Sequence, residues 1–263
     1  VKSVRIAACD LNGQMRGKRL PGFEKEKFKD GSIRMPLSAL NVDIFGADIE
    51  NSPLVFETGD QDGLLKITSR GVIPVPWLHN PTALIPMSMF TEDEAPFEGD
   101  PRYALERVLK SYESKGLKAF AATEMEFYLI DERKTSILPP INPISGKRLS
   151  TSDVLGISEL DCFDDFFTDL QNGCEQIGIT IQSVTSESGC GQFEVTLKHC
   201  DALTASDDAW LFKLLTKGLA RKHGIAATFM AKPYLQDAGN GMHIHFSIID
   251  RNGDNIFNNN RNE

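Results

Sequence analysis

The chain has 263 residues, of which 41% are hydrophobic and 25% charged, so it can bury a core as one large domain or as two smaller ones. Its formal net charge of −9 argues against nucleic acid as a partner, because phosphate binding needs clustered Lys and Arg side chains. No apolar run approaches the ~20 residues that span a bilayer, and we expect no membrane segment. The five cysteines form no C-x-x-C pair, which argues against a disulfide framework or a thiolate zinc site and, without a signal peptide, favours the cytoplasm.

Residues 1–95 are predicted to form a small, turn-rich, mostly β domain. Residues 3–9 have the apolar composition of a strand, and the Asn12-Gly13 pair that follows is typical of a hairpin turn. Short apolar runs then alternate with Gly, Asp and Pro. Repeated prolines from about residue 74 to residue 101 predict a linker in that region.

Residues 96–263 are predicted to form a second domain, in which strands and helices alternate in an α/β pattern. Asp100 is a suitable N-cap, Pro101 suits the first helical position, and Gly116 suits the end of that helix. The other predicted elements are strands at 118–130, 179–185, 191–197, 225–230 and 242–250, and helices at 163–176 and 204–223. Asn252-Gly253 predicts a further hairpin.

Two carboxylates share one face of the predicted strand 118–130. Side chains alternate along a strand, so Glu124 and Glu126 point one way while Met125 and Phe127 point the other. Adjacent carboxylates repel each other and cost stability unless a cation lies between them or water surrounds them. Standing alone, such a pair is also typical of a solvent-facing strand.

Two other predicted strands carry polar residues with the same period. His243, His245 and Ser247 share one face, and Ile244, Phe246 and Ile248 are expected to face the core. On the third strand, Gln192, Glu194 and Thr196 share a face, and Glu187 lies in the loop just before it. Each pattern could be an ordinary polar face, but strands of one α/β domain can bring such side chains into a common pocket.

The combination of four carboxylates, one or two imidazoles and no thiolate favours a hard divalent ion, Mg²⁺ or Mn²⁺, over structural zinc. So acidic a cluster is expected to hold more than one ion. Ions bound in this way keep open positions that phosphate oxygens can fill. The residues alone therefore predict a multi-metal site that handles phosphate, and they do not identify the acceptor.

Four motifs in this order resemble the signature of the glutamine synthetase family. They are Thr-Glu-Met-Glu-Phe-Tyr-Leu (123–129), Glu187 through Gly-Gln-Phe-Glu (191–194), Phe-Met-Ala-Lys-Pro (229–233) and Gly-Asn-Gly-Met-His-Ile-His-Phe-Ser (239–247). The similarity covers nearly the whole chain. Asp-Leu-Asn-Gly through Arg-Gly-Lys (10–18) and Glu-Thr-Gly-Asp-Gln-Asp-Gly (57–63) are more similar to the bacterial branch that includes γ-glutamylputrescine synthetases than to housekeeping glutamine synthetase.

This resemblance implies a β-grasp N-terminal domain followed by the first part of the glutamine synthetase catalytic α/β barrel-like domain. It implies an ATP-dependent ligase that activates the γ-carboxylate of glutamate as an acyl phosphate, which ammonia or an amine such as putrescine then attacks. The implied partners are glutamate, ATP, the amine and further copies of the chain in a dodecamer-type ring. A plain glutamine synthetase and a catalytically silent relative remain the alternatives.

The resemblance also implies roles for particular residues. One metal ion would be held by Glu126, Glu187 and Glu194, and a second by Glu124 and His243 with a further Glu beyond residue 263. His245 and Ser247 match positions on the nucleotide side, and Gly239 matches the loop that approaches glutamate.

The substrate loop departs from the family pattern. The family usually has Asn-Gly-Ser-Gly where this chain has Ala238-Gly239-Asn240-Gly241, so Ala238 replaces an Asn whose amide helps to hold glutamate. Asp43 and Asp48 are both candidates for the family's ammonium-binding Asp. The family's phosphate-clamping Arg residues would lie later, so we expect these 263 residues to be C-terminally truncated and without ligase activity on their own.

Overall fold

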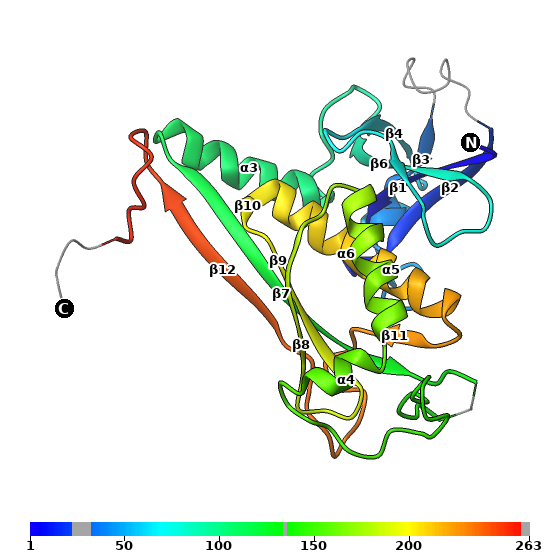
Figure 1. Ribbon diagram of the computed structural model, residues 1–263. Helices are drawn as coiled ribbons and strands as arrows, with labels where there is room; N and C mark the ends of the chain where they lie inside the picture. The colour runs from blue at the N-terminus through cyan, green and yellow to red at the C-terminus, as the bar shows by residue number, and fades with distance from the viewer. Residues whose placement is uncertain (23–32, 134–135, 259–263) are drawn as a thin grey trace. The chain divides into compact units, whose positions relative to one another are not determined.

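The computed structural model describes residues 1–22, 33–133 and 136–258 (Figure 1). The chain separates into two compact units, Val1–Gly116 and Leu117–Glu263. The helix α3 (Pro101–Ser114) belongs to the first unit by its contacts. The domain division after residue 95 stays a prediction.

A mixed sheet forms the first unit, with the strand order β2-β1-β6-β4-β3 and with β5 beside β6. Its strands are β1 (Ser3–Cys9), β2 (Met15–Pro21), β3 (Arg34–Pro36), β4 (Asp62–Ile67), β5 (Ile73–Pro74) and β6 (Thr82–Phe90), with the short helices η1 (Leu37–Leu40) and α2 (Pro53–Phe56). The hairpin predicted at Asn12-Gly13 joins β1 to β2, which pair antiparallel. β6 runs parallel to β1 on its other side.

The linker predicted between residues 74 and 101 is wrong, because this region contains β6, a central strand of the sheet. Pro86 lies where the antiparallel neighbour of β6 changes from β5 to β4, and a proline without an N–H is tolerated at such an irregular point. The preceding Ala83, Leu84 and Ile85 are at most 3% exposed. Their burial, rather than proline content, determines the structure here.

The helix predicted after Asp100 is confirmed. The Asp100 carboxylate accepts hydrogen bonds from the backbone N–H groups of Arg102 and Tyr103, which satisfies two donors of the first helical turn. It also accepts from the N–H of Met89, at 2.8 Å, so the cap ties the helix to β6.

β7 (Lys118–Ile130) is the central strand of the second unit, and its pairings are all antiparallel. The sheet order is β10-β7-β9-β8, and β11 and β12 also pair with β7. The other strands are β8 (Ile181–Ser186), β9 (Gln192–Leu197), β10 (Cys200–Asp201), β11 (Ala226–Thr228) and β12 (Met242–Ile249). The helices are α4 (Ile157–Asp161), α5 (Asp164–Gln176) and α6 (Ala202–Lys222). The main predicted strands and helices of this region are thus confirmed, with small shifts at their ends.

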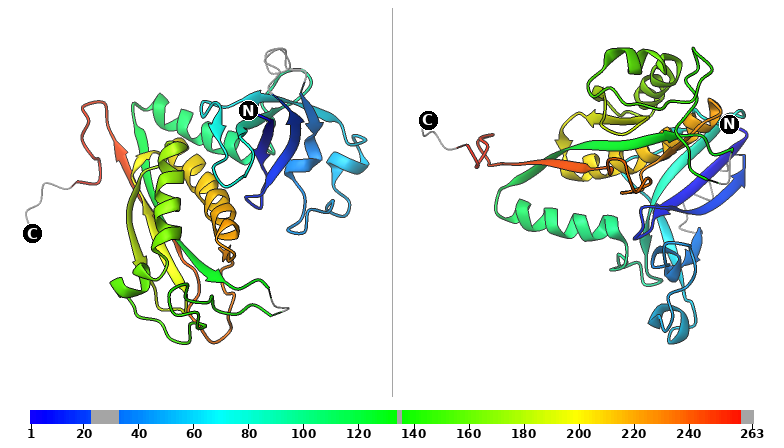
Figure 2. Two further views of the ribbon diagram at one scale, coloured as in Figure 1. Left: turned by 45° about the vertical axis from the view of Figure 1, so that its right-hand side comes forward. Right: turned by 90° about the horizontal axis from the view of Figure 1, so that it is seen from below.

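One face of this sheet is covered by α6 on β7, with α5 beside α6 (Figure 2). Aromatic rings fill the space between the layers. The centroid of Phe127 on β7 lies 6.4 Å from that of Phe193 on β9 and 6.4 Å from that of Phe212 on α6. All three side chains are fully buried. This core fixes which residues of β7 and β9 point to the opposite face.

The prediction that Ile244, Phe246 and Ile248 all face the core is partly wrong. Ile248 is 6% exposed, whereas Ile244 is 61% and Phe246 is 49% exposed. The alternation of side chains is as predicted, but α6 packs on β7 and leaves most of the neighbouring β12 uncovered (Figure 1). Period two determines the face of a side chain, not whether another element covers it.

None of the five cysteines, all of which lie in the described ranges, forms a disulfide bond. None of the helices within the described ranges is both long and apolar enough to cross a membrane.

Candidate metal centre

The uncovered face of the second sheet carries the predicted acidic residues. On β7, Met125 and Phe127 are at most 2% exposed in the core, and Glu124 and Glu126 alternate with them toward the opposite face. The β7–β9 register places Glu126 directly opposite Glu194. The β7–β12 register places His243 directly opposite Glu124. Strand pairing therefore gathers side chains that lie up to 119 residues apart in the chain.

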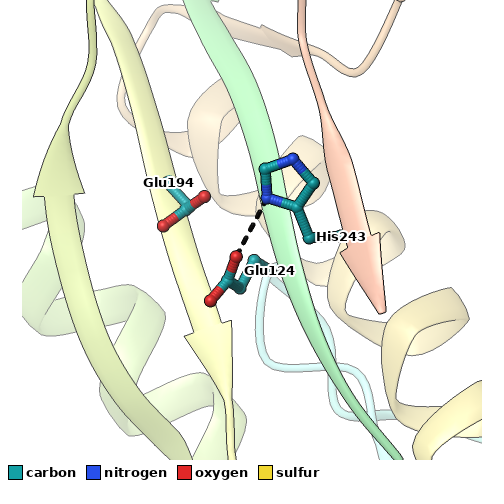
Figure 3. Close-up of side chains that lie close together, drawn as sticks. All are labelled: Glu124, Glu194 and His243. Carbon is teal, nitrogen blue, oxygen red and sulfur yellow. Dashed lines mark hydrogen bonds and ion pairs between the residues drawn. The ribbon is translucent and has the colours of Figure 1, made fainter. Parts of the chain in front are cut away.

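Three of the predicted ligands form a compact group. One ligand atom from each of Glu124, Glu194 and His243 lies within 4.8 Å of the others, the only such group found among the described residues. Figure 3 shows these side chains on three adjacent strands, turned toward a common point on the same side of the sheet.

The two histidines of β12 both contact Glu124. Nδ1 of His243 lies 3.0 Å from Oε2 of Glu124, and Nε2 of His245 lies 2.8 Å from Oε1. The hydrogen bonds from His245 and His243 lower the pKa of Glu124. In return, the bond to Glu124 raises the pKa of His243. Both carboxylate oxygens of Glu124 are thus held in place by imidazole rings.

The surroundings of Glu194 disfavour its charged form. Partial burial raises its pKa, and the negative charges of Glu124, Glu187 and Glu126 raise it further. Glu187 and Glu126 lie outside the group within 4.8 Å, but their charges act on the same carboxyl group. A cation placed among these oxygens would relieve the repulsion, so the residues present fit a divalent ion with oxygen and imidazole ligands.

The loop with the substrate-loop pattern runs close to these residues. A Cβ on Gly241 would lie 2.6 Å from Oε1 of Glu126, so a larger residue here would force this carboxylate to shift. A Cβ on Gly239 would lie 2.8 Å from the carbonyl oxygen of Ala231. Ser247 lies two residues beyond His245 on the same strand and is half-buried.

Sequence reasoning gave no role to Gln192, which shares a strand face with Glu194. Its side chain is buried and lies within hydrogen-bonding distance of Glu126, Gly239 and Asn240. The available signal was a long amide two residues from a predicted ligand, on the face that also carries carboxylates.

Residues 98–263 match the family model for the catalytic domain of glutamine synthetase. The chain belongs to the glutamine synthetase family. The predicted resemblance is thereby confirmed.

Curated relatives within the glutamine synthetase family include three enzymes with different names. The γ-glutamylputrescine synthetase of Escherichia coli K12 is 36% identical over 96% of this chain and 54% of its own length. The glutamate–isopropylamine ligase of a Pseudomonas species is 31% identical over 98% of this chain and 56% of its own length. The glutamine synthetase of Thermotoga maritima is 30% identical over 95% of this chain and 53% of its own length. The chain therefore spans about half the length of these relatives.

Solved structures of the family share this fold. A structure described as a novel glutamine synthase homolog superposes with a TM-score of 0.83 at 22% identity, over 97% of this chain and 57% of that one. Apo GmaS without ligand superposes with a TM-score of 0.80 at 26% identity, over 99% of this chain and 57% of that one. The prediction of a glutamine synthetase-type fold is confirmed at this level.

Proposed function

We propose that this chain contributes the metal-dependent part of an ATP-dependent carbon–nitrogen ligase, which joins the γ-carboxylate of glutamate to an amine. The observation that carries the proposal is the group formed by Glu124, Glu194 and His243 on the uncovered face of a glutamine synthetase-type sheet. The named activities of the relatives, glutamate–amine ligases and glutamine synthetases, support the same reaction class.

We assign Glu126, Glu187 and Glu194 to one Mg²⁺ or Mn²⁺ ion, and Glu124 and His243 to a second. The cross-strand pair Glu126–Glu194 and the contact between Glu124 and His243 support this division. Bound ions of this kind neutralise phosphate charge and orient a triphosphate. His245 and Ser247 are assigned to the nucleotide side and Gly239 to the glutamate side.

The proposed reaction has two steps. A γ-carboxylate oxygen of glutamate attacks the γ-phosphorus of ATP, ADP leaves, and γ-glutamyl phosphate forms. The amine nitrogen then attacks the acyl carbon, inorganic phosphate leaves, and the nitrogen gives up a proton. Phosphoryl transfer needs positioning and charge neutralisation more than a protein nucleophile, which suits a site made of carboxylates and imidazoles.

A polyamine or another primary amine is proposed as the acceptor in preference to ammonia. The 36% identity to γ-glutamylputrescine synthetase, against 30% to the glutamine synthetase of Thermotoga maritima, supports this choice. Glutamine synthesis is the second candidate, because relatives of that name also match 95% or more of the chain.

Two further proposals follow from family membership. A β-grasp fold is proposed for the first unit, supported by the parallel pairing of β1 with β6 within its sheet. A ring-shaped homo-oligomer in the cytoplasm is proposed for the full-length protein.

Phosphate release by the full-length protein, measured with ATP, Mg²⁺, glutamate and a panel of amines, tests the proposal. We expect release that depends on both glutamate and an amine, and that falls at least 100-fold in Glu194→Gln, because a negative charge that would contact the metal ion is lost. Stimulation by putrescine identifies the polyamine branch, and stimulation by ammonia alone identifies glutamine synthesis. Phosphate release that does not depend on an amine would contradict the proposed ligase, and so would the absence of any phosphate release.

A further inference from the structure

Gln192, at the start of β9, is a long polar side chain that is only 1% exposed. A buried carboxamide costs free energy unless its donor and acceptor groups are paired. All of its hydrogen-bonding groups find partners here. Oε1 accepts from the N–H of Gly189 at 2.9 Å, and Nε2 donates to Oε2 of Glu126 at 2.9 Å.

The same Nε2 also reaches the substrate loop. It lies 2.9 Å from the carbonyl oxygen of Gly239 and 3.1 Å from Oδ1 of Asn240. These neighbours fix the orientation of the amide. In the flipped orientation, an NH₂ group would face the N–H of Gly189, and the amide oxygen would face the Glu126 carboxylate.

Asn240 is anchored independently of Gln192. Its Nδ2 donates to the carbonyl oxygen of Met230 at 2.8 Å, and its backbone N–H donates to the carbonyl oxygen of Ala231 at 2.8 Å. At position 240 this chain has Asn, whereas the Asn-Gly-Ser-Gly pattern of the family has Ser. The longer side chain gives Gln192 an acceptor on a part of the loop that is already fixed.

The main chain of Gln192 holds the loop that carries Glu187. Its carbonyl oxygen accepts from the N–H of Glu187 at 2.9 Å, and its own N–H donates to the carbonyl oxygen of Gly189 at 2.9 Å. One residue therefore joins the Glu187 loop, the Glu126 carboxylate on β7 and the loop at Gly239 and Asn240.

We propose that Gln192 is a positioning residue that orients Glu126 for its metal ion and fixes the Gly239–Asn240 loop relative to that ion. This inference rests on the proposed function, because it takes Glu126 as a metal ligand and the loop as the glutamate side. Groups that hold a metal ligand from behind typically change metal affinity or activity by about 10–100-fold when removed. Gln192 acts on two parts of the site through one amide, so its loss is expected to affect both metal affinity and glutamate binding.

Three variants of the full-length protein test this role. Gln192→Met keeps the length of the side chain and removes its hydrogen bonds. Asn240→Ser restores the family residue and removes only one acceptor of Gln192. Gln182→Met, at an exposed position of β8, is the matched control for the first change. Mn²⁺ affinity is measured from the electron paramagnetic resonance signal of free Mn²⁺, and kcat and KM for glutamate are measured separately.

For Gln192→Met we expect the Kd for Mn²⁺ and the KM for glutamate each to rise about 10-fold or more relative to Gln182→Met. For Asn240→Ser we expect a several-fold higher KM for glutamate and a Kd for Mn²⁺ within twofold of wild type. A purely structural role would lower the melting temperature and the active fraction without changing the Kd or KM of the folded molecules.

The inference is overturned if folded Gln192→Met matches Gln182→Met within twofold in both constants. If Gln192→Met does not fold, Asn240→Ser decides, and an unchanged KM for glutamate overturns the link to the loop. A wild-type protein that binds no Mn²⁺ and releases no phosphate would instead contradict the proposed function.

Discussion

The same strands make both faces of the β7–β9 sheet, and the two faces affect its stability in opposite ways. On the covered face, Phe127 and Phe193 are fully buried beneath α6 and its neighbours. On the other face, Glu126 stands directly opposite Glu194, a pairing of like charges that weakens the sheet. Along each strand, the buried aromatic residues therefore stabilise the sheet, and the carboxylates that alternate with them destabilise it.

This difference supports the proposal that the acidic face binds a ligand and does not stabilise the fold by itself. Burial of rings stabilises the chain whether or not an ion is bound. The carboxylates become favourable only when a cation balances them. Substitutions on the two faces should therefore respond differently to added metal.

The covered face should give the largest effect on stability. Replacing Phe127 with Ala removes a ring that lies 5.3 Å from Phe229 and 6.4 Å from Phe193 and Phe212 between centroids. We expect the free energy of unfolding to fall by about 3–5 kcal/mol, as measured by urea denaturation. Phe246→Ala on β12, where the ring is 49% exposed, is the control and should cost far less. Equal losses at the two positions would remove the contrast between covered and uncovered strands.

Added metal should stabilise the wild-type protein through the uncovered face. At a concentration of 100 times Kd, the Mn²⁺ ion assigned to Glu126, Glu187 and Glu194 is expected to add about 2.7 kcal/mol to the free energy of unfolding. Glu194→Gln should lose most of this gain, and Glu113→Gln, on the exposed surface of α3, should keep it. Thermal unfolding with and without Mn²⁺ measures the difference. A gain that survives Glu194→Gln would place the ion elsewhere.

Asp131, directly after β7, provides a carboxylate whose charge is balanced by the protein itself. Arg133 and Arg148 donate to it and hold its pKa well below the usual range. A depressed folded pKa means that this contribution to stability is present above the unfolded pKa of about 4 and is lost as the pH falls through the folded pKa.

Acid unfolding of Asp131→Asn measures that contribution. We expect the variant to be less stable than wild type at neutral pH, and the two curves to converge as the pH drops below about 4. Added Mn²⁺ should not change the difference between them. A difference that is constant down to the lowest pH would contradict the ion-pair explanation.

The smallest effect is expected for Glu194→Gln without metal. Removing a charge directly opposite Glu126 should raise the free energy of unfolding by about 0.2–1 kcal/mol. Urea denaturation in the presence of a chelator measures it, with Glu113→Gln again as the control. Loss of stability in metal-free Glu194→Gln would show that the carboxylate stabilises the sheet by itself.

Local patterns in the sequence predicted much of the second unit. Alternation placed Glu124 and Glu126 away from the core, and the N-cap at Asp100 located a helix to within a residue. These features depend on residues close together in the chain, where period and capping chemistry act directly. Pairing of β7 with β9 and β12 then brought Glu194 and His243 to Glu124, as the motifs had suggested.

The features that the sequence predicted wrongly or missed depend on contacts between residues that are far apart in the chain. Repeated prolines predicted a linker, yet Pro86 lies in β6 between two pairing partners, where a missing N–H is tolerated. The exposure of Ile244 and Phe246 depends on which strands the helices cover. The role of Gln192 depends on Glu126 of β7, 66 residues away, and on the Gly239–Asn240 loop, neither of which the sequence alone places beside it.

The central claim is that side chains from β7, β9 and β12 share divalent metal ions. A crystal soaked in Mn²⁺ and measured by anomalous scattering tests it directly. We expect one strong peak beside the carboxylates of Glu126, Glu187 and Glu194 and a second beside Glu124 and His243. Anomalous density only at other positions, with both of these sites empty at a saturating Mn²⁺ concentration, would contradict the claim.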